Sequence, residues 1–154
     1  MYVPKIFGYK SEKSKTSVRR AWNDESFFDE VKNKFDAATV DIMRNIYEFS
    51  VENAGRIIWG TGMKYGSFSS GFDKTNGKTI YGVYTDGSIS VNFGNFSEYV
   101  DEKKLGKFAD TLRKVKSFNI PVDFTEKYPG GKLQEFSKED GELFKKAVLE
   151  LIEE

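Results

Sequence analysis

The spacing of hydrophobic and polar positions along the chain changes twice. Between residues 24 and 54, apolar side chains recur every three or four positions, which is the period of an amphipathic helix. Between residues 56 and 93, the period becomes two, which is typical of strands. From residue 101 onward the helical period returns. The chain therefore predicts two helices, then a group of strands, then two more helices.

The predicted helices have recognisable end signals. The first begins at Asn23 or Asp24, because a good N-cap residue is followed by acids in the first turn. The last begins at Ser137, which resembles the start of a capping box with Asp140 three residues later. The other two are Ala38–Ala54, which Gly55 ends, and Asp101–Phe118, which Ile120-Pro121 stops.

Four strands are predicted in the central segment: Arg56–Trp59, Ser67–Phe72, Thr79–Thr85 and Ser88–Phe93. The dipeptide Asp86-Gly87 predicts a type I′ turn between the last two strands, and Asn76-Gly77 is a second hairpin signal. The turn at Asp86-Gly87 sets a register, because side chains alternate between the two faces of a strand. The more apolar face is predicted to carry Ile80, Gly82, Tyr84, Ile89, Val91 and Phe93, opposite a face with Tyr81, Val83, Thr85, Ser88, Ser90 and Asn92.

This order of elements predicts an α+β domain. We expect a four-stranded antiparallel β-meander with four helices packed mainly on one face, because the strands are clustered between helices rather than alternating with them. Residues 24–154 match a single domain in length. Residues 1–23 show no sustained period and are interpreted as a basic N-terminal arm, with an ordinary terminus or a linker remnant as the alternative.

Charge changes the picture because it is unevenly distributed. Lys and Arg total 24, as do Asp and Glu, so the net charge is zero. Residues 1–23 nevertheless carry six cations against one acid, whereas residues 24–54 have a net charge of −5. A neutral total argues against a protein that coats DNA, but it leaves room for a local basic surface. The sequence lacks a long apolar run, a secretion signal and cysteine, and therefore predicts a cytoplasmic location.

Two missing residue types exclude several chemistries. The chain has no histidine and no cysteine, so the usual zinc sites, Ser-His-Asp and Cys-His catalysis, and redox thiols are not available to it. The glycine-rich run from Gly55 to Thr61 lacks the lysine of a phosphate-binding loop and leads into a strand rather than a helix. No cofactor is predicted.

A magnesium-dependent nuclease is the enzymatic alternative, because such a site needs only oxygen ligands. Acid-x-Lys tripeptides typical of restriction-type nucleases occur at Glu30-Val31-Lys32, Asp101-Glu102-Lys103 and Glu102-Lys103-Lys104. All three fall on predicted helices instead of strands, which is expected of a Lys- and Glu-rich surface. The balance of residues favours binding over catalysis.

The central segment combines aromatic rings, on which bases can stack, with cations that can contact phosphates, and both are typical of a nucleic-acid-binding surface. The candidate contacts on the sheet surface are Trp59, Lys64, Tyr65 and Lys78, and those in the arm are Lys13, Lys15, Arg19 and Arg20. Lys64 is the strongest single candidate. The competing interpretation is a core role for the rings, which is favoured for Trp59 and Phe68 and evenly balanced for Tyr65 and Tyr81.

Four sequence features carry a resemblance: Trp59-Gly60-Thr61-Gly62, Lys64-Tyr65-Gly66-Ser67-Phe68, the hairpin from Tyr81 to Ser88, and Ile120-Pro121. Over residues 38–154 the chain resembles a small uncharacterised bacterial domain often found C-terminal to restriction-nuclease-like or defence-associated modules. This resemblance implies a noncatalytic accessory role beside a partner nuclease or defence module. Our first hypothesis is therefore an accessory domain that assists nucleic-acid binding, and the second is a protein-interaction or oligomerisation module.

Overall fold

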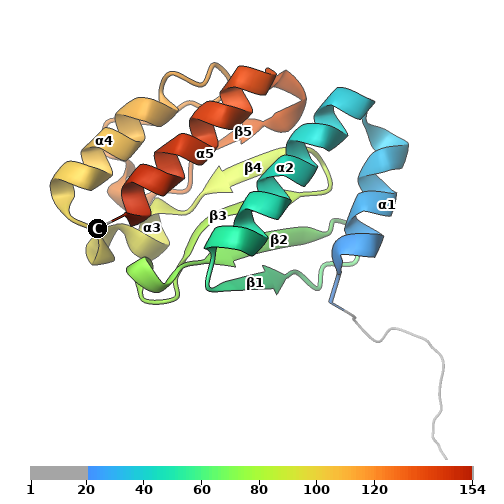
Figure 1. Ribbon diagram of the computed structural model, residues 1–154, viewed down its shortest axis with the longest axis horizontal. Helices are drawn as coiled ribbons and strands as arrows, with labels where there is room; N and C mark the ends of the chain where they lie inside the picture. The colour runs from blue at the N-terminus through green and yellow to red at the C-terminus, as the bar shows by residue number, and fades with distance from the viewer. Residues whose placement is uncertain (1–20, 154) are drawn as a thin grey trace, which may run out of the picture.

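A computed structural model describes residues 21–153, which form an α+β fold around one open antiparallel sheet (Figure 1). The sheet is a meander of five strands in sequence order: β1 (Arg56–Trp59), β2 (Ser67–Gly71), β3 (Thr79–Tyr84), β4 (Ser88–Val91) and β5 (Gly130–Lys132). The described residues also form five α-helices: α1 (Asp24–Lys34), α2 (Ala37–Asn53), α3 (Phe93–Phe96), α4 (Glu102–Leu112) and α5 (Lys138–Ile152).

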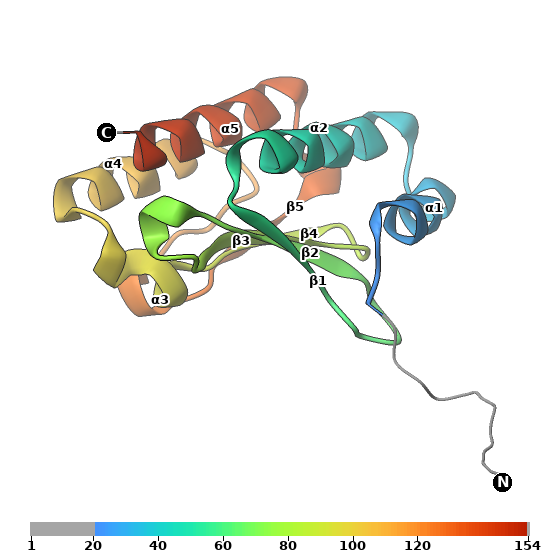
Figure 2. The ribbon, with the colours of Figure 1, turned by 60° about the horizontal axis from the view of Figure 1, so that its bottom comes forward.

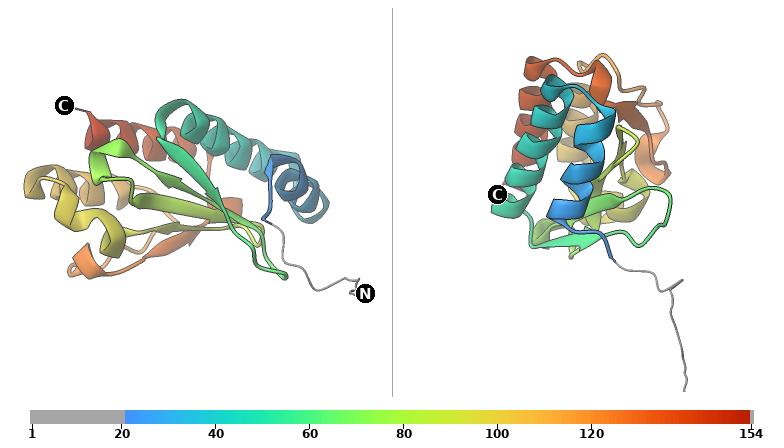
Figure 3. Two further views of the ribbon diagram at one scale, coloured as in Figure 1. Left: turned by 90° about the horizontal axis from the view of Figure 1, so that it is seen from below. Right: turned by 90° about the vertical axis from the view of Figure 1, so that its right-hand side faces the viewer.

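The helices form a layer on one side of the sheet. Figure 2 shows α2, α4 and α5 above the strands and α3 at one end of the sheet. The right-hand view of Figure 3 shows α1, α2 and α5 on the same side of the strands. No described helix is both long enough and apolar enough to cross a bilayer.

The helix starts confirm the predictions made from N-cap residues. The Asn23 side chain accepts a hydrogen bond from the Ser26 amide at 2.8 Å, and the Ser26 hydroxyl accepts one from the Asn23 amide at 3.0 Å. Ser137 and Asp140 form the same reciprocal capping box at the start of α5. These bonds satisfy amides that have no partner within the helix.

The predicted register of the β3–β4 hairpin is wrong by one residue. Tyr81 pairs with Val91 and Val83 pairs with Ile89, so the loop contains Thr85, Asp86 and Gly87 instead of two residues. Only Gly87 has a positive φ, of 92°, as in a three-residue hairpin loop, whereas a type I′ turn needs two such residues. The slip exchanges the two faces of β3 relative to β4. Tyr81 and Val83 are therefore buried with Ile89 and Val91, and Gly82 and Tyr84 share the opposite face with Ser88 and Ser90.

A fifth strand was missed because its sequence, Gly130 to Lys132, has neither bulk nor alternation. β5 pairs with β4 through Ser88 and Lys132, and the Leu133 amide extends this edge by donating to the Gly87 carbonyl at 2.7 Å. The prediction of four strands and four helices is corrected to five of each among the described residues. The extra helix is the short α3, which begins where the fourth strand was expected to continue.

The core is built largely from aromatic rings. Phe27, Tyr47, Trp59 and Phe68 form one cluster, with adjacent ring centroids 5.2–6.1 Å apart. Phe93, Phe96, Phe108 and Phe124 form a second cluster around α3 and α4. The core interpretation is confirmed for Phe68 and Tyr81, which are both fully buried.

Tyr81 is the one ionisable ring in the centre of this core. Its hydroxyl lies 2.5 Å from the Ser50 hydroxyl, and Ser50 donates its own proton to the Ile46 carbonyl at 2.8 Å. Because a serine has only one hydroxyl proton, Tyr81 must donate to Ser50. Burial raises the pKa of Tyr81 to about 12, since the phenolate would be poorly solvated there.

Tyr81 should therefore make stability depend on alkaline pH. The unfolded chain releases this proton near pH 10, whereas the folded chain holds it until about pH 12. The contribution is complete below pH 10 and declines between pH 10 and 12, by roughly 1.4 kcal/mol per pH unit. Tyr81→Phe should cost about 1 kcal/mol at neutral pH and lose this decline, as measured by denaturant unfolding. Tyr84→Phe, on the opposite face, should retain it; equal slopes in both variants would contradict the assignment.

Candidate nucleic-acid interface

The loop of residues 60–66 joins β1 to β2 and is held at three places. The Trp22 amide donates to the Gly60 carbonyl at 2.9 Å, and the Trp22 indole donates to the Gly62 carbonyl at 2.8 Å. At the far end, Gly66 exchanges two hydrogen bonds of 2.9 Å with Thr85. The β1–β2 loop is therefore anchored both to the residue before α1 and to the β3–β4 hairpin.

Gly66 has a clear packing reason to be glycine. A Cβ atom at Gly66 would lie 2.3 Å from Cδ2 of the Trp22 indole, which is far inside van der Waals contact. The indole can lie against the loop only because no side chain is present at this position. The glycine thus permits a close approach of ring and backbone, and it does not form a phosphate cradle.

Tyr65 is the exposed aromatic residue of the β1–β2 loop, with 45% of its surface accessible. The Lys64 and Lys34 ammonium groups lie 5.6 and 5.7 Å from the centre of its ring. Lys34 also pairs with Glu30 at 2.9 Å, so only Lys64 has its full charge available. A ring flanked by cations can stack on a nucleobase while the cations contact phosphates.

The other two sheet candidates do not join this cluster. Trp59 is half-buried on the helix side of β1, where its ring packs against Phe27, Tyr47 and Phe68 in the aromatic cluster of the core. Lys78 is exposed but precedes β3, at the other end of β2 from Lys64. The five residues of β2 separate the two lysines by about 17 Å along the sheet.

The arm candidates Lys13, Lys15, Arg19 and Arg20 lie outside the described residues. The described chain begins at Ala21, and Trp22 is bonded directly to the β1–β2 loop. Trp22, one of the last residues of the predicted arm, therefore lies beside the loop that carries Lys64 and Tyr65. Lys34 was missed by the sequence analysis, since nothing in the spacing of α1 indicates that its last residue approaches Tyr65.

The acidic residues offer no contrasting site in the described chain. Within residues 21–153, no three Asp or Glu side chains come together as a group that could hold a metal ion. The acid-x-Lys tripeptides lie on α1 and at the start of α4, as predicted, and not on strands.

Comparisons with protein-family models, curated proteins and solved structures found no match to this chain, so the resemblance to the bacterial accessory domain stays a prediction.

Proposed function

We propose that this domain is a noncatalytic accessory module that helps a partner module of a restriction or defence system bind nucleic acid. The observation that carries the proposal is the cluster at the β1–β2 loop, where Tyr65 lies between Lys34 and Lys64. Trp22, near the end of the predicted arm of residues 1–23, is hydrogen-bonded to the same loop. The Tyr65 ring, the two lysines and Trp22 thus lie together at one end of the sheet.

The chemistry of this cluster favours unpaired bases. A tyrosine ring offers a flat face to any base, and stacking of this kind is worth about 1–3 kcal/mol per base. One or two lysines beside the ring add phosphate contacts that are independent of sequence. We therefore expect weak, salt-dependent binding to single strands with little sequence preference.

A protein-interaction or oligomerisation role is the second candidate. Ile58 and Met63 are exposed near the same loop, by 37% and 75% of their surfaces. β1 also pairs only with β2 among the described strands, so its other edge can accept a strand from another chain. Sedimentation separates the candidates: a stable dimer that Ile58→Lys dissociates would support this role over the first.

Tyr65→Ala should weaken binding to a 20-nucleotide single strand by roughly 5- to 150-fold, because the stacking platform is lost. Lys64→Gln should make the dependence of log affinity on log salt less steep by about 0.7. Fluorescence anisotropy at several salt concentrations measures both changes. Tyr99→Ala is the matched control, since Tyr99 has a similar exposure of 38% but lies outside the loop. Absence of binding at low salt, or equal effects of the two tyrosine variants, would contradict the proposal.

A further inference from the structure

Helix α4 and the turn that follows it carry a row of lysines on the side opposite the buried face of the helix. At 100° per residue, Lys103 and Lys107 lie about 40° apart around α4. Lys114 follows the end of the helix in a turn whose amides bond three residues back, and at about 120° per residue this turn keeps Lys114 on the same side as Lys107. All three side chains are exposed. The residues that α4 buries, Leu105, Phe108, Ala109 and Leu112, lie on the other side of the helix. We call Lys103, Lys107 and Lys114 the lysine ridge; it extends over roughly 16 Å.

The neighbouring cations have structural roles that the ridge lysines lack. Lys104 donates to the carbonyl of Glu153, which ties α4 to the end of α5. Arg113 bonds Asp110 at 2.8 Å and also the carbonyls of Ile120 and Pro121. Among the described residues, no ion pair or side-chain hydrogen bond involves the ammonium group of a ridge lysine. Their charge is therefore available to a ligand.

Helix stability does not account for a lysine at the start of α4. Lys103 is the second residue of the helix, close to its positive end, where the helix dipole disfavours cations. An acid would stabilise the first turn of the helix. The N-cap Asp101 does so, because it accepts hydrogen bonds from the Lys103 and Lys104 amides. The helix dipole therefore gives no reason for a lysine at this position.

We infer that the lysine ridge contacts the phosphate backbone of double-stranded nucleic acid. This inference rests on the proposed function and adds a second contact surface to it. A duplex carries one negative charge per about 1.7 Å of axis, so each ridge lysine can meet a phosphate. Asp110 lies on the same side of α4 between Lys107 and Lys114, but its charge is paired with Arg113 at 2.8 Å. The ridge itself contains no ring, and its contacts are therefore with phosphates and independent of base sequence.

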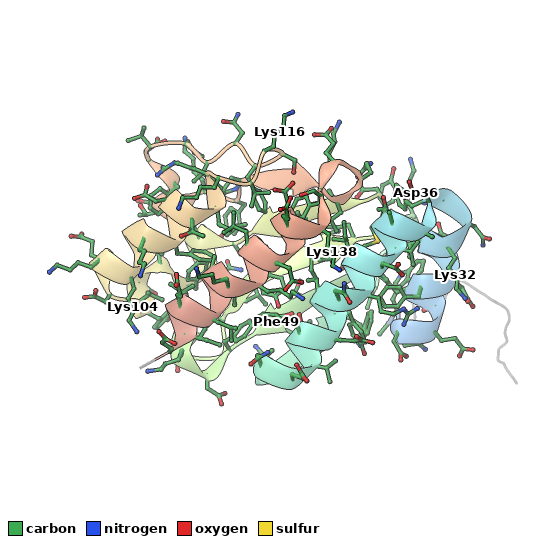
Figure 4. All side chains as sticks on the ribbon, turned by 45° about the horizontal axis from the view of Figure 1, so that its top comes forward. Lys32, Asp36, Phe49, Lys104, Lys116 and Lys138 are labelled. Carbon is green, nitrogen blue, oxygen red and sulfur yellow. The ribbon has the colours of Figure 1, made fainter. Side chains whose placement is uncertain are left out.

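The ridge and the β1–β2 loop are at opposite ends of the molecule. Figure 1 shows α4 at the left of the sheet and α1, which precedes the loop cluster, at the right. In Figure 4, Lys104 in the first turn of α4 lies on the opposite side of the molecule from Lys32 in α1. The ridge therefore acts on duplexes separately from the stacking site on the loop.

The test compares two triple variants that remove the same charge. Lys103→Gln/Lys107→Gln/Lys114→Gln removes the ridge, and Lys132→Gln/Lys138→Gln/Lys146→Gln removes three exposed lysines elsewhere. Binding of the full chain to a 16-base-pair duplex is measured by anisotropy from low to moderate salt. The ridge variant should make the slope of log affinity against log salt less negative by about 2.7, at about 0.9 per lost contact. The control should keep the wild-type slope.

The outcomes separate this inference from the proposed function. Equal slopes for the two triple variants, with Tyr65-dependent binding to single strands intact, would overturn the ridge alone. Absence of wild-type binding to either nucleic acid would overturn both. Thermal unfolding should be the same for both triple variants within a few degrees, because all six lysines are on the surface.

Discussion

Replacing Phe68 by alanine is expected to lower the free energy of unfolding by about 3–5 kcal/mol. Phe68 is fully buried, and its ring lies 5.2 Å from that of Phe27, 5.3 Å from Tyr47 and 5.7 Å from Trp59. Phe68, in β2, therefore packs against residues of α1, α2 and the neighbouring strand β1. Its removal leaves a cavity that the two helices cannot close without losing their other contacts. Urea denaturation followed by circular dichroism measures the change.

Met63→Ala is the control for this prediction. Met63 is in the β1–β2 loop and 75% exposed, so its truncation should change stability by less than about 0.5 kcal/mol. A loss below about 1 kcal/mol for Phe68→Ala would show that the aromatic cluster repacks freely. The layer of α1 and α2 over β1 and β2 would then need another source of stability.

Gly66→Ala is expected to destabilise the protein by about 1–3 kcal/mol and to release the Trp22 indole. The new methyl group would lie 2.3 Å from the ring, and neither the ring nor the paired backbone at Thr85 can move away easily. Displacing the indole also removes its 2.8 Å hydrogen bond to Gly62. The released Trp22 indole would be more exposed to water, so a red shift in tryptophan emission should accompany the loss of stability. Trp59, the other tryptophan of the chain, should contribute little to this change.

Gly106→Ala is the matched control, because a methyl group there meets no atom within 4 Å. Gly106 lies inside α4, so this substitution should instead stabilise the protein by about 0.5–1 kcal/mol. If Gly66→Ala were as stable as the wild type with unchanged emission, the anchoring of the β1–β2 loop by Trp22 would be wrong.

Local signals in the sequence predicted the helix starts, and long-range packing decided what was missed. Asn23 and Ser137 were correctly identified as N-caps because each bonds an amide only three residues away. The β3–β4 register depends on whether Thr85 belongs to the strand or to the loop, and both readings place glycine in the turn. Burial of Tyr81 against Ser50 favours the observed register, and no spacing rule contains that contact.

The candidate site was predictable to a similar extent. Lys64 and Tyr65 are adjacent in sequence and are both exposed, as a binding role requires. Trp59 was a candidate contact for which a core role was favoured. In the structure its alternation with Ile58 puts it on the helix side of β1, packed against the core. Lys34 reaches Tyr65 only because α1 packs against the start of the sheet, and Lys78 is separated from Lys64 by the direction of β2.

The two hydrogen bonds of Trp22 have a consequence for avidity. They fix the origin of the chain that precedes Ala21 at the edge of the β1–β2 loop. A strand held on Tyr65 would therefore lie close to Trp22, and any contact that it makes with the residues before Ala21 would be intramolecular, at an effective concentration of roughly millimolar. Two weak contacts would then hold one ligand together, and separating the arm from the domain would remove the gain in affinity that the linkage provides.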